Sequence, residues 1–202
     1  MHTASLNGKT DAVRLLIDSV DYEELNLRDV CGATPLTDAI KGGHPEIVKI
    51  LLKTQSRDSS SILSNEFDSL GRRPLDLAAM FGRLDIFSIV LEASISASTT
   101  VTSDSRCSEE SSVLSSSSIK SDVLLNRNGD RGRIPLHYAA LEGQTSVVEW
   151  IVNEMRADNY RDDDILVLDE DGNSPLHLAL LGKHSSCVEL LTNGHFDIAV
   201  QK

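Results

Sequence analysis

The sequence predicts an all-α protein built as a solenoid of repeated two-helix units. A line with Pro, Leu and Ala at fixed positions recurs four times, a Gly follows each of the first three copies, and an apolar stripe follows that Gly. A repeated supersecondary unit of this kind fixes the architecture of the whole chain. The copies are Thr34–Ala39, Arg73–Ala78, Ile134–Ala139 and Ser174–Ala179, and a partial copy begins at Met1.

The first helix of each unit is predicted to begin at the Pro, because a missing N–H costs nothing in the first helical turn. Thr34 and Ser174 precede that Pro and can cap their helices with a side-chain oxygen, whereas Arg73 and Ile134 offer no hydroxyl. A Gly ends the helix because it accepts the left-handed conformation, at Gly8, Gly43, Gly82 and Gly143. Lys183 stands at this position in the fifth unit, so that helix end is expected to be shifted or strained.

The second helix of each unit is predicted from three apolar columns at spacing i, i+2, i+3. The columns begin with Val13, Leu15 and Leu16 in the first unit and recur in every later one. A further column is Ala in all five units, which lets neighbouring helices approach closely: Ala4, Ala39, Ala78, Ala139 and Ala179.

A turn precedes each first helix, with Gly two or three positions before the Pro and Asp29, Asp68 or Asp169 before that Gly. This plan of turn, helix, Gly and helix resembles the ankyrin repeat, whose unit of about 33 residues carries a Thr-Pro-Leu-His-x-Ala line. Pro135–Gly143 and Pro175–Ala179 are close matches, while Thr37 and Asp76 stand where the family has His. The resemblance implies an ankyrin-repeat solenoid with short β-turn fingers.

One long insertion divides the array. The repeat prolines are 39, 61 and 40 residues apart, so about 28 extra residues fall between the third and fourth units. Residues 94–122 hold 13 Ser, three Thr and no aromatic residue, a composition that predicts disorder without a helix of its own. We therefore expect repeats one (partial) to three in residues 1–93, a Ser-rich disordered insertion in 94–122, and repeats four and five in 123–202.

Composition excludes several classes of partner. The formal net charge of −12 argues against binding nucleic acid or an anionic membrane surface, and no apolar run is long enough to span a membrane. Three distant cysteines form neither a disulfide framework nor a metal-binding spacing, which favours a reducing, cytoplasmic or nuclear location. No catalytic constellation or cofactor motif is present, so we expect no enzyme activity and no cofactor.

The resemblance implies that the array binds a partner protein on its concave surface, made of the finger tips and the exposed side of the first helices. Met80, Phe81, Leu141 and Leu181 are apolar where polar residues are usual, and exposed apolar patches mark interaction sites. The same surface would include Tyr138 and the finger residues Arg72, Arg131, Glu170 and Asp171. Burial of the four apolar residues beneath an insertion or another part of the protein is the alternative.

Two further functions stay open. The segment from Glu154 to Asp171 carries eight acidic and two basic residues, as a solvated loop or as a contact for a basic segment of, for example, a transcription factor. Alternatively, the chain is the regulatory array of a larger enzyme or channel, or a monomeric adaptor. Phosphorylation of the Ser-rich insertion would add negative charge beside units three and four, and Ser108, next to Glu109 and Glu110, is the first candidate; a passive insertion is the alternative.

Overall fold

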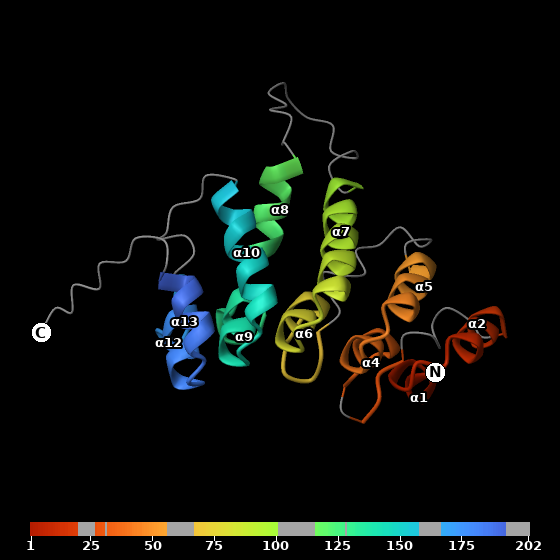
Figure 1. Cartoon of the computed structure of the whole chain (residues 1–202). Helices are drawn as coiled ribbons and strands as arrows, with labels where there is room; N and C mark the ends of the chain where they lie inside the picture. The colour runs from red at the N-terminus through yellow and green to blue at the C-terminus, as the bar shows by residue number, and fades with distance from the viewer. Residues whose placement is uncertain are drawn as a thin grey trace, which may run out of the picture.

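The computed structural model describes residues 1–19, 27–30, 32–55, 67–100, 116–127, 129–157 and 167–192. Within these ranges the chain forms helix pairs that stand side by side in sequence order, with unit one at one end and unit five at the other (Figure 1). No helix in the described part is long and apolar enough to cross a membrane.

Each unit contributes a shorter inner helix and an outer helix. The inner helices are α1 (His2–Leu6), α4 (Pro35–Gly42), α6 (Pro74–Met80), α9 (Pro135–Leu141) and α12 (Pro175–Leu181). The outer helices are α2 (Thr10–Ser19), α5 (Pro45–Gln55), α7 (Leu84–Thr100), α10 (Thr145–Ala157) and α13 (Ser185–Thr192). Each inner helix packs against the inner helix of the next unit, so that the core runs along the array.

The core lies where the repeat pattern places it. The Ala column is fully buried from Ala39 onward. On the outer helices the columns of Val48 and Leu51 join the same buried cluster, whereas the column between them is partly buried at Ile89, Trp150 and Leu190 and exposed at Leu15. Phe87 of α7 meets Trp150 of α10 edge to face, with ring centroids 5.5 Å apart. This continuity means that each unit depends on its neighbours for burial of its apolar side chains.

In units two and five the inner helix begins as predicted, with reciprocal hydrogen bonds between the residue before Pro and the third helical residue. Thr34 and Ser174 accept from the backbone N–H of Thr37 and His177, whereas Arg73 and Ile134 provide no side-chain cap. The backbone N–H of Arg73 instead donates to Asp76 Oδ2 at 2.9 Å. In each of these units the N–H of the residue before Pro therefore donates to the side chain three residues later. The acceptor is Thr37 in unit two and Asp76 in unit three, and it is His137 in unit four.

The prediction that residues 94–122 lack helical structure is wrong at both ends of that segment. Helix α7 continues to Thr100, and a further helix, α8, spans Ser116–Leu124 beside α7 and near α10 (Figure 1). Lys120 of α8 pairs with Glu154 of α10 and lies 5.7 Å from the Trp150 ring centroid, while Leu124 is buried. Sparse apolar residues suffice here because the neighbouring outer helices already supply the apolar surface. Residues 101–115 lie outside the described residues.

Candidate protein-binding surface

The fingers of units three, four and five are joined to one another by backbone hydrogen bonds. The N–H of Asp130 donates to the carbonyl of Gly71 at 3.0 Å, and the N–H of Glu170 donates to the carbonyl of Arg131 at 2.9 Å. Each finger also closes on itself, as Asp68 accepts the N–H groups of Leu70 and Arg72 at 2.9 Å. The fingers therefore form a continuous row whose side chains keep fixed positions along the array.

Ion pairs hold the charged finger residues. Arg72 binds Asp68 through Nε at 2.8 Å, and Arg131 Nη1 lies 2.9 Å from Asp171 Oδ2. Arg133 pairs with the buried carboxylate of Asp169 at 3.0 Å. Burial acts to raise the pKa of Asp169, but hydrogen bonds from Asn173 and the pairing with Arg133 outweigh it and lower that pKa. The carboxylate is thus kept charged inside the finger of unit five.

Sequence reasoning did not identify two arginines that bridge neighbouring fingers. Arg28 Nη1 donates to the carbonyls of Gly32 and Phe67, and Arg127 donates through Nε to the carbonyl of Gly132 and through Nη2 to that of Leu168. Each arginine lies one or two positions before its finger turn, and this position is the feature of the sequence that could have identified it. Because the two arginines stand at different repeat positions, comparison of the repeats alone conceals them.

The predicted apolar residues lie at or beside the carboxyl ends of three adjacent inner helices. Phe81 is 38% exposed and Leu181 is 68% exposed, while Met80 and Leu141 are half-buried. Arg72 Nη1 lies 3.4 Å from the sulfur of Met80, so this arginine connects finger three to the end of α6. We call Met80, Phe81, Leu141, Leu181 and the finger residues Arg72, Arg131, Glu170 and Asp171 the inner surface.

Tyr138 does not belong to this surface. Its side chain is 4% exposed, and its hydroxyl donates to the carbonyl of Asp130 at 3.4 Å. Burial raises the pKa of the Tyr138 phenol above its usual value. The tyrosine connects α9 to the finger of unit four, because the ring fills the space between them. The prediction that Tyr138 contacts a partner is therefore wrong.

The remaining predicted residues separate into two groups. Arg131, Glu170 and Asp171 are exposed and lie on the fingers of units four and five, which the Arg131–Asp171 pair brings together. Ser108 and much of the acidic segment, residues 158–166, lie outside the described residues.

One cluster in the described part has the composition of a metal site. His2, Asp29 and Asp38 offer ligand atoms within 4.8 Å of one another. The ring nitrogens of His2 are, however, 2.9 Å from Asp38 Oδ2 and 2.9 Å from the carbonyl of Leu27, and Asp29 Oδ1 accepts the N–H of Ala33 at 2.8 Å. Hydrogen bonding between α1, α4 and the first finger accounts for this arrangement.

Comparison with known families agrees with the repeat geometry. A family model described as ankyrin repeats (3 copies) matches residues 1–101 and 112–202. The chain belongs to the ankyrin-repeat family. Ankyrin repeats imply protein–protein interaction and are in general not catalytic.

Two curated relatives from rice (Oryza sativa subsp. japonica) are similar to this ankyrin array. One, named "Probable E3 ubiquitin-protein ligase XBOS32", is 28% identical over 158 residues, which cover 76% of this chain and 30% of the relative. The other, named "Probable E3 ubiquitin-protein ligase XBOS33", is 30% identical over 166 residues, covering 76% and 31%. The matches thus span less than a third of the length of either relative.

Proposed function

We propose that this ankyrin array is a non-catalytic adaptor that binds a segment of a partner protein on the inner surface. The observation that carries the proposal is the exposure of Phe81 and Leu181, two large apolar side chains that the repeat core does not require. Desolvation of such side chains by a partner is favourable by roughly 25 cal/mol for each Å² buried. Arg131, Glu170 and Asp171 would contribute polar contacts at the rim of the same surface.

The test is affinity capture with the full chain, followed by measurement of the affinity for the captured protein. We expect Phe81→Asp with Leu181→Asp to weaken binding at least tenfold, since a carboxylate in an apolar contact must be desolvated. Leu15→Asp is the matched control, because Leu15 is 71% exposed but lies on the outer helix α2. Equal binding by the two variants would refute the inner surface as the binding site.

A second candidate is a substrate-recruiting array within a larger ubiquitin ligase. It rests on the names of the two rice relatives and on their greater length. In a reconstituted ubiquitin-transfer assay, the 202-residue chain alone is expected to transfer no ubiquitin. In a separate binding assay, the chain is expected to bind a protein that a ligase component ubiquitinates. Ubiquitin transfer by the isolated chain would contradict the non-catalytic assignment.

We also propose a cytoplasmic or nuclear location. Cys187 is a free cysteine buried beside α10, where burial raises the pKa of its thiol. Imaging of the tagged full-length protein in cells tests this, and secretion into the medium would contradict it.

A further inference from the structure

Two histidines at the same repeat position face different groups through Nδ1. In unit four, His137 Nδ1 accepts the backbone N–H of Ile134 at 3.2 Å. His2 stands at the equivalent position of unit one, at the start of α1, but its Nδ1 lies 2.9 Å from the carboxylate of Asp38 in α4. An ionised carboxylate has no hydrogen to donate. The Nδ1 atom that accepts in His137 must therefore donate in His2.

The other ring nitrogen of His2 also faces an acceptor. Its Nε2 lies 2.9 Å from the carbonyl oxygen of Leu27, in the segment that leads into the first finger. A neutral imidazole carries one N–H and can donate only one of these two hydrogen bonds, whereas an imidazolium carries two N–H groups. The two hydrogen bonds of His2 therefore form together only when the ring is protonated.

A second carboxylate lies beside this pair. Asp29 of the first finger offers a ligand atom within 4.8 Å of those of His2 and Asp38. The side chains of His2 and Asp38 are 27% and 11% exposed, so that water screens their interaction less than at an open surface. Two carboxylates at this distance attract an imidazolium but not a neutral ring.

The remaining charged groups of α1, α2, α4 and the first finger are directed elsewhere or exposed. They are the α-amino group of Met1, Lys9, Asp11, Arg14, Asp18, Arg28 and Lys41. The side chains of Lys9, Asp11, Arg14 and Asp18 are exposed. Arg28 Nη1 donates to the carbonyls of Gly32 and Phe67. In the part of the chain that the structure describes, His2 is the cationic residue that pairs with Asp38.

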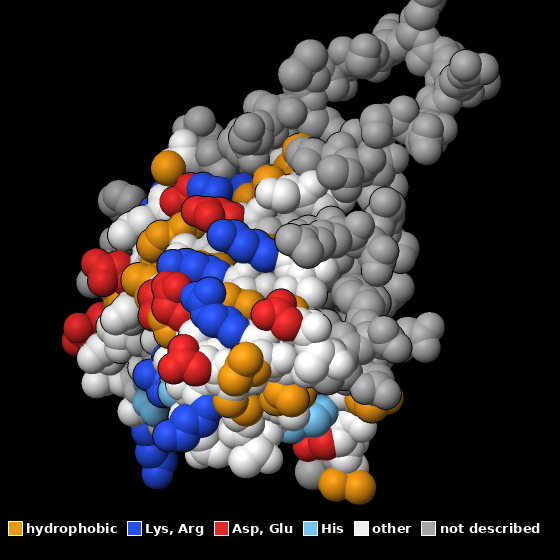
Figure 2. Space-filling view, turned by 90° about the vertical axis from the view of Figure 1, so that its right-hand side faces the viewer, with side chains coloured by type: hydrophobic (Ala, Val, Ile, Leu, Met, Phe, Trp, Pro, Cys, Tyr) orange, Lys and Arg blue, Asp and Glu red, His pale blue; other side chains and the backbone are white. Residues whose placement is uncertain are grey.

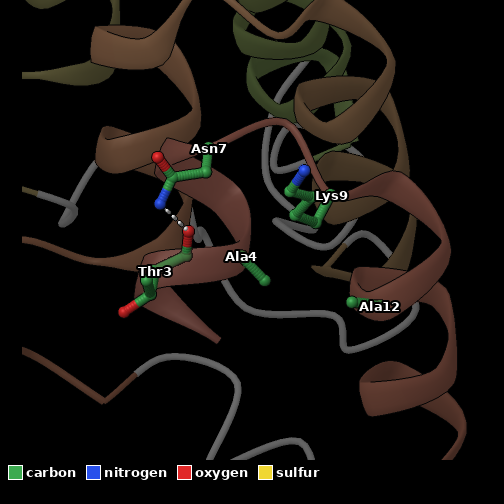
Figure 3. A pocket seen from close by; sticks show the side chains of 5 residues that line it. All are labelled: Thr3, Ala4, Asn7, Lys9 and Ala12. Carbon is green, nitrogen blue, oxygen red and sulfur yellow. Dashed lines mark hydrogen bonds between the residues drawn. The ribbon is translucent and has the colours of Figure 1, made fainter.

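Helix α1 depends on such contacts because it is short. It has five residues, and Met1 makes no side-chain hydrogen bond to it within the described ranges. At its carboxyl end, Asn7 Nδ2 donates to the carbonyl of Thr3 at 2.8 Å (Figure 3). Figure 2 views this end of the array and shows histidine and acidic side chains at its surface. A helix of this length is not stable alone, so its packing on α4 and the bonds of His2 hold it in place.

We propose that His2 is a pH-sensitive clamp, which fastens α1 and the first finger to α4 when the ring is protonated and releases one of them when the ring is neutral. In the neutral ring, one nitrogen has no hydrogen and faces either the carboxylate of Asp38 or the carbonyl of Leu27 with a lone pair. Unit one is therefore held more firmly in mild acid than in mild base. This clamp is independent of partner binding on the inner surface.

The experiment measures amide hydrogen exchange of the full chain, in EDTA, at about pH 5.5 and about pH 8.5. An ordinary imidazole is protonated at the first pH and neutral at the second, while carboxylates are ionised at both. The readout is the protection of the N–H groups of Ser5 and Asn7, which donate to the carbonyls of Met1 and Thr3. After correction for the intrinsic exchange rate, we expect protection to be at least tenfold lower at pH 8.5.

Asp38→Asn distinguishes the clamp from a merely structural contact. The Asn amide donates to Nδ1 of a neutral ring while Nε2 donates to Leu27, so the variant is expected to be protected at pH 8.5 at least as well as at pH 5.5. The matched control is Asp18→Asn, which removes an exposed carboxylate from α2 and is expected to keep the tenfold difference. His2→Gln does not titrate and is expected to lose the pH dependence, whatever its overall protection.

Three results would overturn the proposal. The first is equal protection of the natural chain at the two pH values. The second is a tenfold loss of protection at pH 8.5 that persists in Asp38→Asn, and the third is the same loss in His2→Gln. The last variant keeps the test decisive if Asp38→Asn leaves α1 unprotected at both pH values.

Discussion

The buried His137 predicts a specific loss of stability in acid. Its Nδ1 accepts the backbone N–H of Ile134 at 3.2 Å, so the proton of the neutral ring is on Nε2, which donates to the carbonyl of Asn173 at 3.2 Å. Protonation would place a second donor against the N–H of Ile134 in a fully buried site. Burial lowers the pKa of His137 to about 4, although the carboxylate of Asp169 acts in the opposite direction.

The sign and size of the effect follow from this pKa. The unfolded chain binds the proton near the ordinary value of 6.5, and the folded chain near 4. Stability is therefore complete above pH 6.5 and falls as the pH is lowered toward 4. At about 1.36 kcal/mol for each pH unit, His137 accounts for a loss of roughly 3 kcal/mol over this window.

The assay compares urea unfolding of the natural chain and of His137→Thr at several values between pH 7 and pH 4. Thr is the natural residue at the equivalent position 37, where its Oγ1 accepts the N–H of Thr34 at 2.8 Å, so the variant keeps an acceptor that does not titrate. Titration of Asp68 is common to both proteins and cancels in the difference. We expect the natural chain to lose about 3 kcal/mol more than the variant. Parallel pH profiles would refute the assignment of a buried neutral imidazole.

Four further predictions concern other parts of the chain. Lys183→Gly is expected to raise the unfolding free energy by about 1 kcal/mol, because a left-handed conformation costs a side-chain-bearing residue 1–2 kcal/mol, and an unchanged urea midpoint would contradict this. Leu124→Ala is expected to cost about 2–4 kcal/mol by leaving a cavity between α8 and α7, whereas a loss below about 0.5 kcal/mol would show that α8 is not packed. Ser5→Ala is expected to stabilise the chain by about 1 kcal/mol in thermal unfolding, since Ser5 Oγ is buried with no hydrogen-bond partner in the described part, and a lower melting temperature would show an unrecognised bond. Mass spectrometry of the protein from cells is expected to find phosphate on Ser108, and an unmodified segment 94–121 would remove that proposal.

The sequence by itself determined the repeat architecture. The recurring Pro, Leu, Ala and Gly positions predicted where the inner helices begin and end, because caps, helix termination and close approach of helices depend on residue type at fixed spacing. The same alignment predicted the strained helix end at Lys183, and the structure confirms it with a positive φ.

The tertiary structure decided which side chains remain exposed. Tyr138 and Leu181 occupy neighbouring columns of the same pattern, yet one fills a space beneath a finger and the other is open to solvent. Helix α8 likewise depends on contacts with α7 and α10, which a local composition rich in Ser does not reveal. The pairing of Arg28 and Arg127 with carbonyls of the next finger has the same origin. Local sequence sets the conformation of each unit, but burial and long-range hydrogen bonds arise only when the units stack.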